Sequence, residues 1–138
     1  MAAAAPQPLV LSLGEPAGVG PEIVARAWEA LKAGGAPFVV LGDARLIGTH
    51  APVRVIGDLT DAAAVFAAAL PVLDMPLPVP ARPGRPDSAN AGAVADWIEL
   101  GVDLCLSGEA SGLVTAPISK APLYAAGFRF PGHTEFIA

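Results

Sequence analysis

Short apolar runs alternate along the chain with segments whose apolar residues recur every three or four positions. The clearest run covers residues 9–13 (LVLSL), and only Ser12 interrupts it. Further runs cover residues 38–41, 53–56 and 113–114. Uniformly apolar strands are typical of parallel sheets, because helices cover both faces of such sheets. The pattern therefore predicts an α/β fold built on a parallel sheet.

The first helix is expected directly after a glycine-rich turn at residues 14–20. Pro21 suits the first helical position, where its missing N–H costs nothing, and Gly34 with Gly35 ends the helix. The apolar residues between these limits recur at helical spacing and predict one buried face. They are Ile23, Val24, Ala27, Trp28 and Leu31.

The glycine-rich turn lies between a strand and a helix, as phosphate-binding turns do. The spacing of Gly14, Gly18 and Gly20 nevertheless matches neither the dinucleotide-binding fingerprint nor a P-loop, which needs Lys followed by Ser or Thr. A compact turn whose glycines only permit close backbone packing explains the same residues. Both interpretations stay open, and Glu15 and Glu22 are the polar residues of interest.

The middle of the chain predicts another strand and helix pair and then an irregular region. Asp43 is expected to cap a short helix over residues 44–47. His50 follows in a loop and is interpreted as a surface residue. The alanine-rich residues 61–70 suit a helix, whereas residues 71–80 contain four prolines and are expected to form an edge strand or extended segment.

Residues 81–90 are rich in Pro, Gly, Arg and Asp and predict an exposed loop, the expected boundary within the chain. Arg82 and Arg85 in this loop could meet an anion, although we prefer their interpretation as solvated charges. Asp87 or Ser88 is expected to cap a long helix. Its predicted buried face carries Ala91, Val94, Ala95, Ile98, Val102 and Cys105. Its acidic residues are interpreted as a solvated face rather than a metal site: Asp96, Glu99 and Asp103.

Composition narrows the class of protein. The chain has 138 residues, of which 54% are hydrophobic and 15% charged, enough for a globular domain with a sizeable core. A net charge of −5 with dispersed basic residues argues against a nucleic-acid partner. Residues 1–8 lack a positively charged segment, and no long apolar stretch suits a membrane helix. The single cysteine, Cys105, is expected to be a buried structural thiol in a reducing compartment, so we predict a soluble cytoplasmic protein.

Polar side chains gather in one stretch, residues 112–136. A strand at Leu113 and Val114, interpreted as buried, leads through a turn toward Lys120, at the end of the sheet where ligands bind in α/β folds. A Pro-Gly turn then presents His133 and Thr134, which could hydrogen-bond a small polar molecule. By spacing alone, a solvated lysine and a His-Thr helix cap explain these residues as well.

Three motifs favour a ligand site over a solvated lysine and a helix cap. They are GEPAGVGPEI at residues 14–23, VTAPISK at residues 114–120 and GHTEF at residues 132–136. Together they closely resemble the 4-hydroxythreonine-4-phosphate dehydrogenase (PdxA) family. The resemblance implies a three-layer α/β/α fold similar to isocitrate and isopropylmalate dehydrogenases, with two domains and an active site completed by both subunits of a homodimer. The implied reaction is the NAD- or NADP-dependent oxidation and decarboxylation of 4-phosphohydroxy-L-threonine to 3-amino-2-oxopropyl phosphate, a step of pyridoxal phosphate biosynthesis. A divalent metal such as Zn, Mg or Co would assist.

On matching positions, the resemblance makes His133 and Thr134 substrate-binding residues and Lys120 an anion or substrate contact. It places the metal ligands, three histidines, beyond Ala138, and His50 lies in no matching motif. Residues 1–138 therefore resemble the N-terminal portion of such an enzyme without its C-terminal half, and the chain alone is expected to be inactive. The alternatives are a paralogue acting on another phosphorylated hydroxy acid, such as threonate or erythronate 4-phosphate, and a non-catalytic phosphate-binding fragment.

Overall fold

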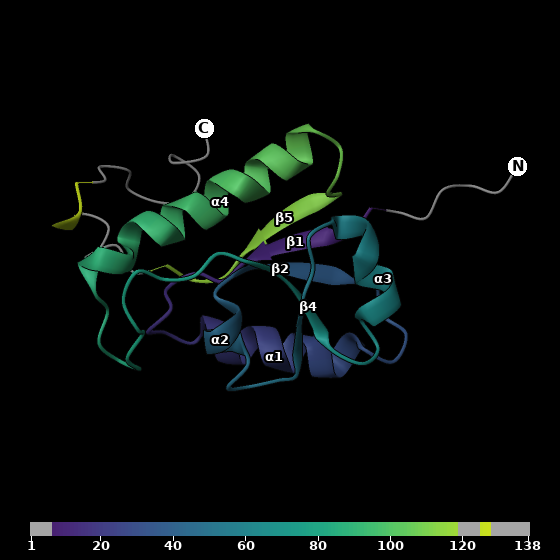
Figure 1. The fold of residues 1–138 in the computed structure, drawn as a ribbon, viewed down its shortest axis with the longest axis horizontal. Coiled ribbons are helices and arrows are strands. Elements are labelled where there is room, and N and C mark those ends of the chain that lie inside the picture. Colours follow the sequence, from purple (N-terminus) through teal and green to yellow (C-terminus); the bar gives the residue numbers. More distant parts are fainter. Residues whose placement is uncertain (1–6, 119–124, 128–138) are drawn as a thin grey trace, which may run out of the picture.

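The fold is organised around one parallel sheet (Figure 1), seen in a computed structural model that describes residues 7–118 and 125–127. Five strands form this sheet in the order β3-β4-β2-β1-β5, and every pairing is parallel. The strands are β1 (Leu9–Ser12), β2 (Phe38–Gly42), β3 (Val53–Val55), β4 (Leu70–Asp74) and β5 (Gly112–Thr115). The predicted α/β class is confirmed.

Helices cover both faces of the sheet. Helices α1 (Gly20–Leu31), α2 (Ala44–Ile47) and α3 (Ala62–Val65) lie on one side, and α4 (Ala91–Leu106) lies on the other (Figure 1). Two short 3₁₀ helices, η1 (Leu59–Asp61) and η2 (Ser88–Asn90), lead into α3 and α4. Helices α1 and α3 are joined by the indole of Trp28, whose Nε1 donates to the carbonyl oxygen of Phe66 at 2.7 Å. This arrangement is the three-layer α/β/α architecture that the family resemblance implied.

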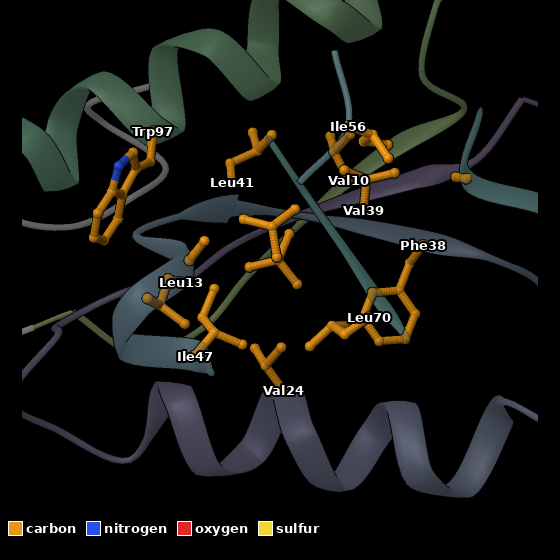
Figure 2. Packing of buried hydrophobic residues seen from close by; sticks show 14 of the residues in the cluster. Val10, Leu13, Val24, Phe38, Val39, Leu41, Ile47, Ile56, Leu70 and Trp97 are labelled. Carbon is orange, nitrogen blue, oxygen red and sulfur yellow. The ribbon is translucent and has the colours of Figure 1, made fainter. Parts of the chain in front are cut away.

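The core lies mainly around the middle of the sheet. All five residues of β2 are buried, and Val24 of α1 and Trp97 of α4 reach toward the sheet from its two sides (Figure 2). Trp97 is fully buried, and its Nε1 donates to the carbonyl oxygen of Met75 at 3.2 Å. A buried tryptophan contributes a large apolar area and needs a partner for its N–H. Trp97 meets both conditions, so it fastens α4 to the sheet.

The prediction of an edge strand or extended segment at residues 71–80 is wrong for residues 71–74, whereas residues 75–80 lie outside any strand. Strand β4 lies inside the sheet, between β3 and β2. Pro71 is tolerated there because β4 begins to pair with β2 only at Val72. The amide of Leu70 donates to the carbonyl oxygen of Pro52, on the side of β3. Because successive residues of a strand direct their backbone groups to alternate sides, Pro71 faces β2, at a position before the pairing with β2 starts. The proline therefore costs no ladder hydrogen bond.

The prediction of a strand at Leu113 and Val114 is confirmed by β5, but the prediction that this strand is buried is wrong. Strand β5 ends the sheet within the described residues, and Val114 is 47% exposed. Leu113 is half-buried under α4, whereas Val114 points to the opposite face. An apolar pair cannot distinguish a central strand from an outer one, because the sequence does not give the strand order.

The buried face of α1 differs in part from the prediction. Val24 and Trp28 are buried as predicted, but Ile23 and Leu31 are exposed. The buried face consists of Pro21 and the residues three, four and seven positions after it, namely Val24, Ala25 and Trp28. Ile23 lies to one side of this face. Leu31 lies on the buried face, but it is exposed because it is the last residue of the helix.

Helix α4 shows a similar shift. Trp97 and Gly101 are buried, whereas Val102 and Cys105 of the predicted face are only half-buried. A Cβ at Gly101 would lie 2.6 Å from Cδ1 of Leu113, so the glycine lets α4 approach β5 closely. Cys105 packs against the core in the last turn of the helix, and the prediction of a fully buried thiol is therefore wrong.

Two further predictions about local structure have clear outcomes. The expected helix at residues 61–70 is only α3, because the chain leaves the helix after Val65 and enters β4 at Leu70. The expected cap of the short helix is confirmed, since Oδ1 of Asp43 accepts from the amide of Arg45 at 2.9 Å.

Candidate functional site at the carboxyl edge of the sheet

Two loops meet where β1 and β5 end. The amide of Ala116 donates to the carbonyl oxygen of Ser12 at 3.1 Å, and the amide of Glu15 donates to that of Pro117 at 2.9 Å. These bonds continue the ladder between the two strands into the glycine-rich turn. The turn is therefore fixed against Ala116 and Pro117 of the VTAPISK motif.

The glycines of the turn are explained by backbone packing. Gly14 has a φ of 76°, and a Cβ there would lie 2.8 Å from the carbonyl oxygen of Ala116. A Cβ at Gly20 would overlap the carbonyl oxygen of Leu13. Of the two interpretations left open by the sequence, the compact turn accounts for both residues.

The turn also uses several of the amides that a phosphate would need. The amide of Ala17 donates to Oε1 of Glu15 at 3.2 Å, and that of Gly18 donates to the carbonyl oxygen of Glu15 at 3.0 Å. The amide of Glu15 is bound to Pro117. Phosphate-binding turns present such groups outward. These three amides therefore do not fit a cradle for the pyrophosphate of a dinucleotide.

Glu15 is the buried carboxyl group of this edge. Its residue is 8% exposed, and its recorded side-chain hydrogen bond comes from the amide of Ala17. Burial raises the pKa of Glu15 above its usual value, and the hydrogen bond from Ala17 opposes this only in part. The sequence marked Glu15 as a residue of interest, but its burial became visible only in the fold.

Ser12 is a polar residue whose environment the sequence did not reveal. It is 1% exposed, and its Oγ has no hydrogen-bond partner among the described residues. Its neighbour across the ladder is Thr115, the last residue of β5. A buried hydroxyl without a partner costs about 1–3 kcal/mol. The carboxyl end of β1 therefore carries a local cost that the centre of the sheet does not.

The carboxylates at the ends of β2 and β4 have structural partners instead. Asp74 accepts from the amide of Ala44 at 2.9 Å, and Asp43 accepts from the amide of Leu77 at the same distance. Burial by itself would raise the pKa of Asp43, but hydrogen bonds from Leu77 and Arg45 outweigh it and lower the pKa. These residues fasten the start of α2 and the segment after β4, and Asp43 is buried in doing so, whereas Asp74 is exposed.

The loop at residues 81–90 reaches the same edge. Nearly all of its residues are exposed, as predicted, and the amide of Gly84 donates to the carbonyl oxygen of Ala17 at 2.8 Å. Asp87 is a cap, since its Oδ1 accepts from the amide of Ala89, but it caps η2 and not the long helix as predicted. Helix α4 follows η2 with Asn90 at its N-cap and no side-chain cap bond. The sequence had not indicated that this loop contacts the glycine-rich turn.

The sequence-predicted substrate residues Lys120, His133 and Thr134 lie outside the described residues, so their roles stay predictions. The described part of β5 and its turn ends at Ile118. His50 is exposed, as predicted. It lines a shallow cavity of about 270 Å³ with Glu22 and Arg26, among others.

No group of three or more His, Cys, Asp or Glu side chains in residues 7–118 and 125–127 could hold a metal ion. The acidic residues Asp96, Glu99 and Asp103 of α4 are exposed, in agreement with their interpretation as a solvated face. Over the same part of the chain, no helix has the length and apolar character needed to cross a bilayer.

The parallel sheet and its two helical layers define a three-layer α/β protein with its loops gathered at the carboxyl edge. Within this class the chain belongs to the PdxA family, because the family described as pyridoxal phosphate biosynthetic protein PdxA matches residues 34–138.

Named proteins agree with this assignment. The chain is 56% identical over 135 residues to 4-hydroxythreonine-4-phosphate dehydrogenase of Caulobacter vibrioides, a match that covers 96% of the chain and 40% of that protein. Its fold is similar to the crystal structure of the Klebsiella pneumoniae enzyme of that name, with a TM-score of 0.79, 30% identity, and coverage of 94% and 43%. The corresponding Burkholderia phymatum structure gives a TM-score of 0.85 at 26% identity, covering 97% and 43%. The chain thus spans about 40% of the length of the curated relatives that it matches.

Proposed function

We propose that this chain is the N-terminal portion of a 4-hydroxythreonine-4-phosphate dehydrogenase. The observation that carries the proposal is the 56% identity to the Caulobacter enzyme over 96% of the chain. The proposed reaction is the NAD-dependent oxidation and decarboxylation of 4-phosphohydroxy-L-threonine. The activity belongs to a longer protein that contains this segment, in keeping with the length of the relatives.

The proposed substrate residues are His133, Thr134 and Lys120. They follow β5 in the chain, and ligands of open α/β sheets bind beyond the carboxyl ends of the strands. A lysine there can neutralise a phosphate or carboxylate, and a histidine with a threonine can bond the hydroxyl or carbonyl groups of the substrate. The hydrogen bonds between β5 and the glycine-rich turn support this location, because they hold the segment at the carboxyl edge.

The proposed cofactors are NAD or NADP and a divalent metal such as Zn, Mg or Co. The described residues offer no metal cluster, and the glycine-rich turn does not fit the cofactor because three of its amides already have hydrogen-bond partners in the fold. We therefore assign the metal site to another part of the longer protein, and the cofactor to a place other than the glycine-rich turn. A cytoplasmic homodimer with two domains, and a boundary near residues 81–90, completes the proposal.

The test is NAD reduction by the protein as its source cells make it, with its intact mass measured first. With 4-phosphohydroxy-L-threonine and a divalent metal, His133→Ala should lower kcat/KM by about 10- to 100-fold, the loss expected for a hydrogen bond to a charged ligand. The chain's other histidine gives the matched control, because His50 is exposed and His50→Ala should leave kcat/KM unchanged.

Two results would contradict the proposal in different ways. Equal kcat/KM in the two histidine variants would remove His133 from the substrate site. A wild-type protein that oxidises threonate or erythronate 4-phosphate but not 4-phosphohydroxy-L-threonine would replace the named substrate by that of a paralogue.

A further inference from the structure

We propose that the turn formed by Arg82, Pro83, Gly84 and Arg85, here called the arginine turn, binds a phosphoryl anion between its two guanidinium groups. The turn is closed by a hydrogen bond from the amide of Arg85 to the carbonyl oxygen of Arg82 at 2.9 Å. Gly84 has a φ of 75°, and Pro followed by a left-handed Gly is the sequence of a type II turn. The two arginines therefore have defined backbone positions.

The turn places two like charges next to each other. Arg82 and Arg85 form an antiparallel bridge, and residues directly opposite in such a bridge project to the same side with Cβ atoms about 5 Å apart. Like charges in these positions repel each other. Neither arginine forms an ion pair within the part of the chain that the structure describes. An anion between the two guanidinium groups would remove this repulsion.

Both arginines line one surface cavity of about 540 Å³. Asp87 is the acidic residue in its lining, and Oδ1 of this residue already accepts from the amide of Ala89 as a helix cap. The cavity thus has two guanidinium groups against one carboxylate in a protein whose net charge is −5. Guanidinium groups bind phosphate oxygens through paired N–H donors, so a phosphoryl group is the anion that suits this site.

The other described cations do not form a comparable site. Arg26 pairs with Glu22 at 2.9 Å, Lys32 with Glu29 at 2.7 Å, and Arg45 with Asp43 at 3.3 Å. Arg54 has no ion pair in the described residues, but it is a single charge on strand β3. The arginine turn is therefore distinguished by two adjacent charges that share one cavity.

The location connects the site to the carboxyl edge of the sheet. The amide of Gly84 donates to the carbonyl oxygen of Ala17, which ties the arginine turn to the glycine-rich turn. A phosphoryl group held there lies next to the glycine-rich turn that follows β1. It could come from a phosphorylated hydroxy acid or from the pyrophosphate of a dinucleotide. Binding itself follows from the geometry and does not depend on the proposed dehydrogenase reaction.

The experiment is a calorimetric titration of the full chain with inorganic phosphate at constant ionic strength. We expect saturable binding that is about 10-fold weaker in Arg82→Gln and in Arg85→Gln, since each removes a charge-assisted pair of hydrogen bonds. Arg54→Gln, which removes an arginine outside the cavity, should bind as the wild type does. Circular dichroism confirms that each variant is folded, which we expect because these side chains are exposed.

Parallel titrations with NAD and with 4-phosphohydroxy-L-threonine identify the source of the phosphoryl group. Tighter binding of either compound than of phosphate, lost in Arg85→Gln, assigns the site to that compound. Absence of saturable phosphate binding by the wild type would overturn the proposal. Phosphate binding that stays unchanged in both arginine variants would overturn it as well, because the anion would then occupy another site.

Discussion

The two sides of the sheet differ in how their residues are used. On the side of β2 and β4, every residue of β2 is buried, and Asp43 and Asp74 accept from the backbone amides of Leu77 and Ala44. On the side of β1 and β5, Val114 is exposed and the Oγ of Ser12 has no partner among the described residues. Strand β2 is fully packed, whereas both outer strands of the described sheet expose apolar surface, β3 at Val55 (55% exposed) and β5 at Val114. The unmatched polar atom lies only on the second side, next to β5.

We interpret the side of β2 and β4 as the main source of stability and the side of β1 and β5 as the place for ligand binding. Packed and hydrogen-bonded residues supply most of the free energy of unfolding, whereas ligand sites commonly carry groups that the fold alone does not satisfy. The side of β1 and β5 is also the one from which the VTAPISK motif leaves the sheet. We expect substitutions on the two sides to have unequal effects on stability, and the predictions below run from the largest effect to the smallest.

The largest effect is expected at the turn that joins β1 to α1. Gly20→Ala would place a Cβ on the carbonyl oxygen of Leu13, and the backbone has to move. We expect a loss of about 3 kcal/mol or more in the free energy of unfolding, measured by urea denaturation. Gly92→Ala in α4 is the control, because nothing lies within 4 Å of its new Cβ, and it should stabilise by up to about 1 kcal/mol. Equal effects would contradict the close packing of the turn.

Two valines compare the sides of the sheet with the same chemical change. Val40 in β2 is fully buried, and Val40→Ala should cost about 2–3 kcal/mol. Val114 in β5 is 47% exposed, and Val114→Ala should cost less than about 1 kcal/mol. Urea denaturation of both variants measures the difference. If Val114→Ala costs as much as Val40→Ala, the open side of the sheet is packed by something that the described residues do not include.

Asp43 should make stability depend on pH on the packed side. Its pKa is lower in the folded protein than in the unfolded chain, so its contribution is present above the unfolded pKa of about 3.9 and is lost as the pH falls through the folded pKa. Asp43→Asn should lower the free energy of unfolding by about 1–2 kcal/mol at neutral pH. It should also flatten the acid limb of a stability profile. An unchanged acid limb would show that the hydrogen bonds to Leu77 and Arg45 do not favour the carboxylate.

Glu15 should make the free energy of unfolding fall as the pH rises, an effect opposite in sign to that of Asp43 and smaller. Because its pKa is raised by burial, its contribution is fully present below the unfolded pKa and is lost as the pH rises through the folded value. Glu15→Gln removes this titration, so stability should stop falling over that range, with a change of about 1 kcal/mol or less. NMR titration of the Glu15 side chain measures the pKa directly. A value below that of an exposed glutamate would contradict burial as the dominant cause.

Much of the fold follows from local sequence signals. Uniform apolar runs predicted β1 and β2, and Asp43 predicted the cap of α2 that the structure shows. The position of β4 could not be predicted in this way, because Pro71 argues against an interior strand unless the register of its neighbours is known. Local patterns give the type of an element, while its neighbours follow only from the complete sheet.

The candidate site shows the same limit. The sequence placed a turn and a lysine-bearing segment after two strands, and the fold brings the ends of those strands together. The bond between Gly84 and Ala17 joins distant parts of the chain and left no local signal. Gly101 was missed because a glycine adds nothing to an apolar pattern, although its missing side chain sets the approach of α4 to β5.

The central claim is that the carboxyl edge beside β1 and β5 binds the phosphorylated substrate. Its most direct test is an amide NMR titration of the ¹⁵N-labelled chain with 4-phosphohydroxy-L-threonine. We predict shifts at residues 14–20 and 115–118, and none around the cavity of about 250 Å³ at the opposite edge, which Leu59 and Thr60 help to line. Shifts confined to that opposite edge, or no shifts at saturating substrate, would contradict the account.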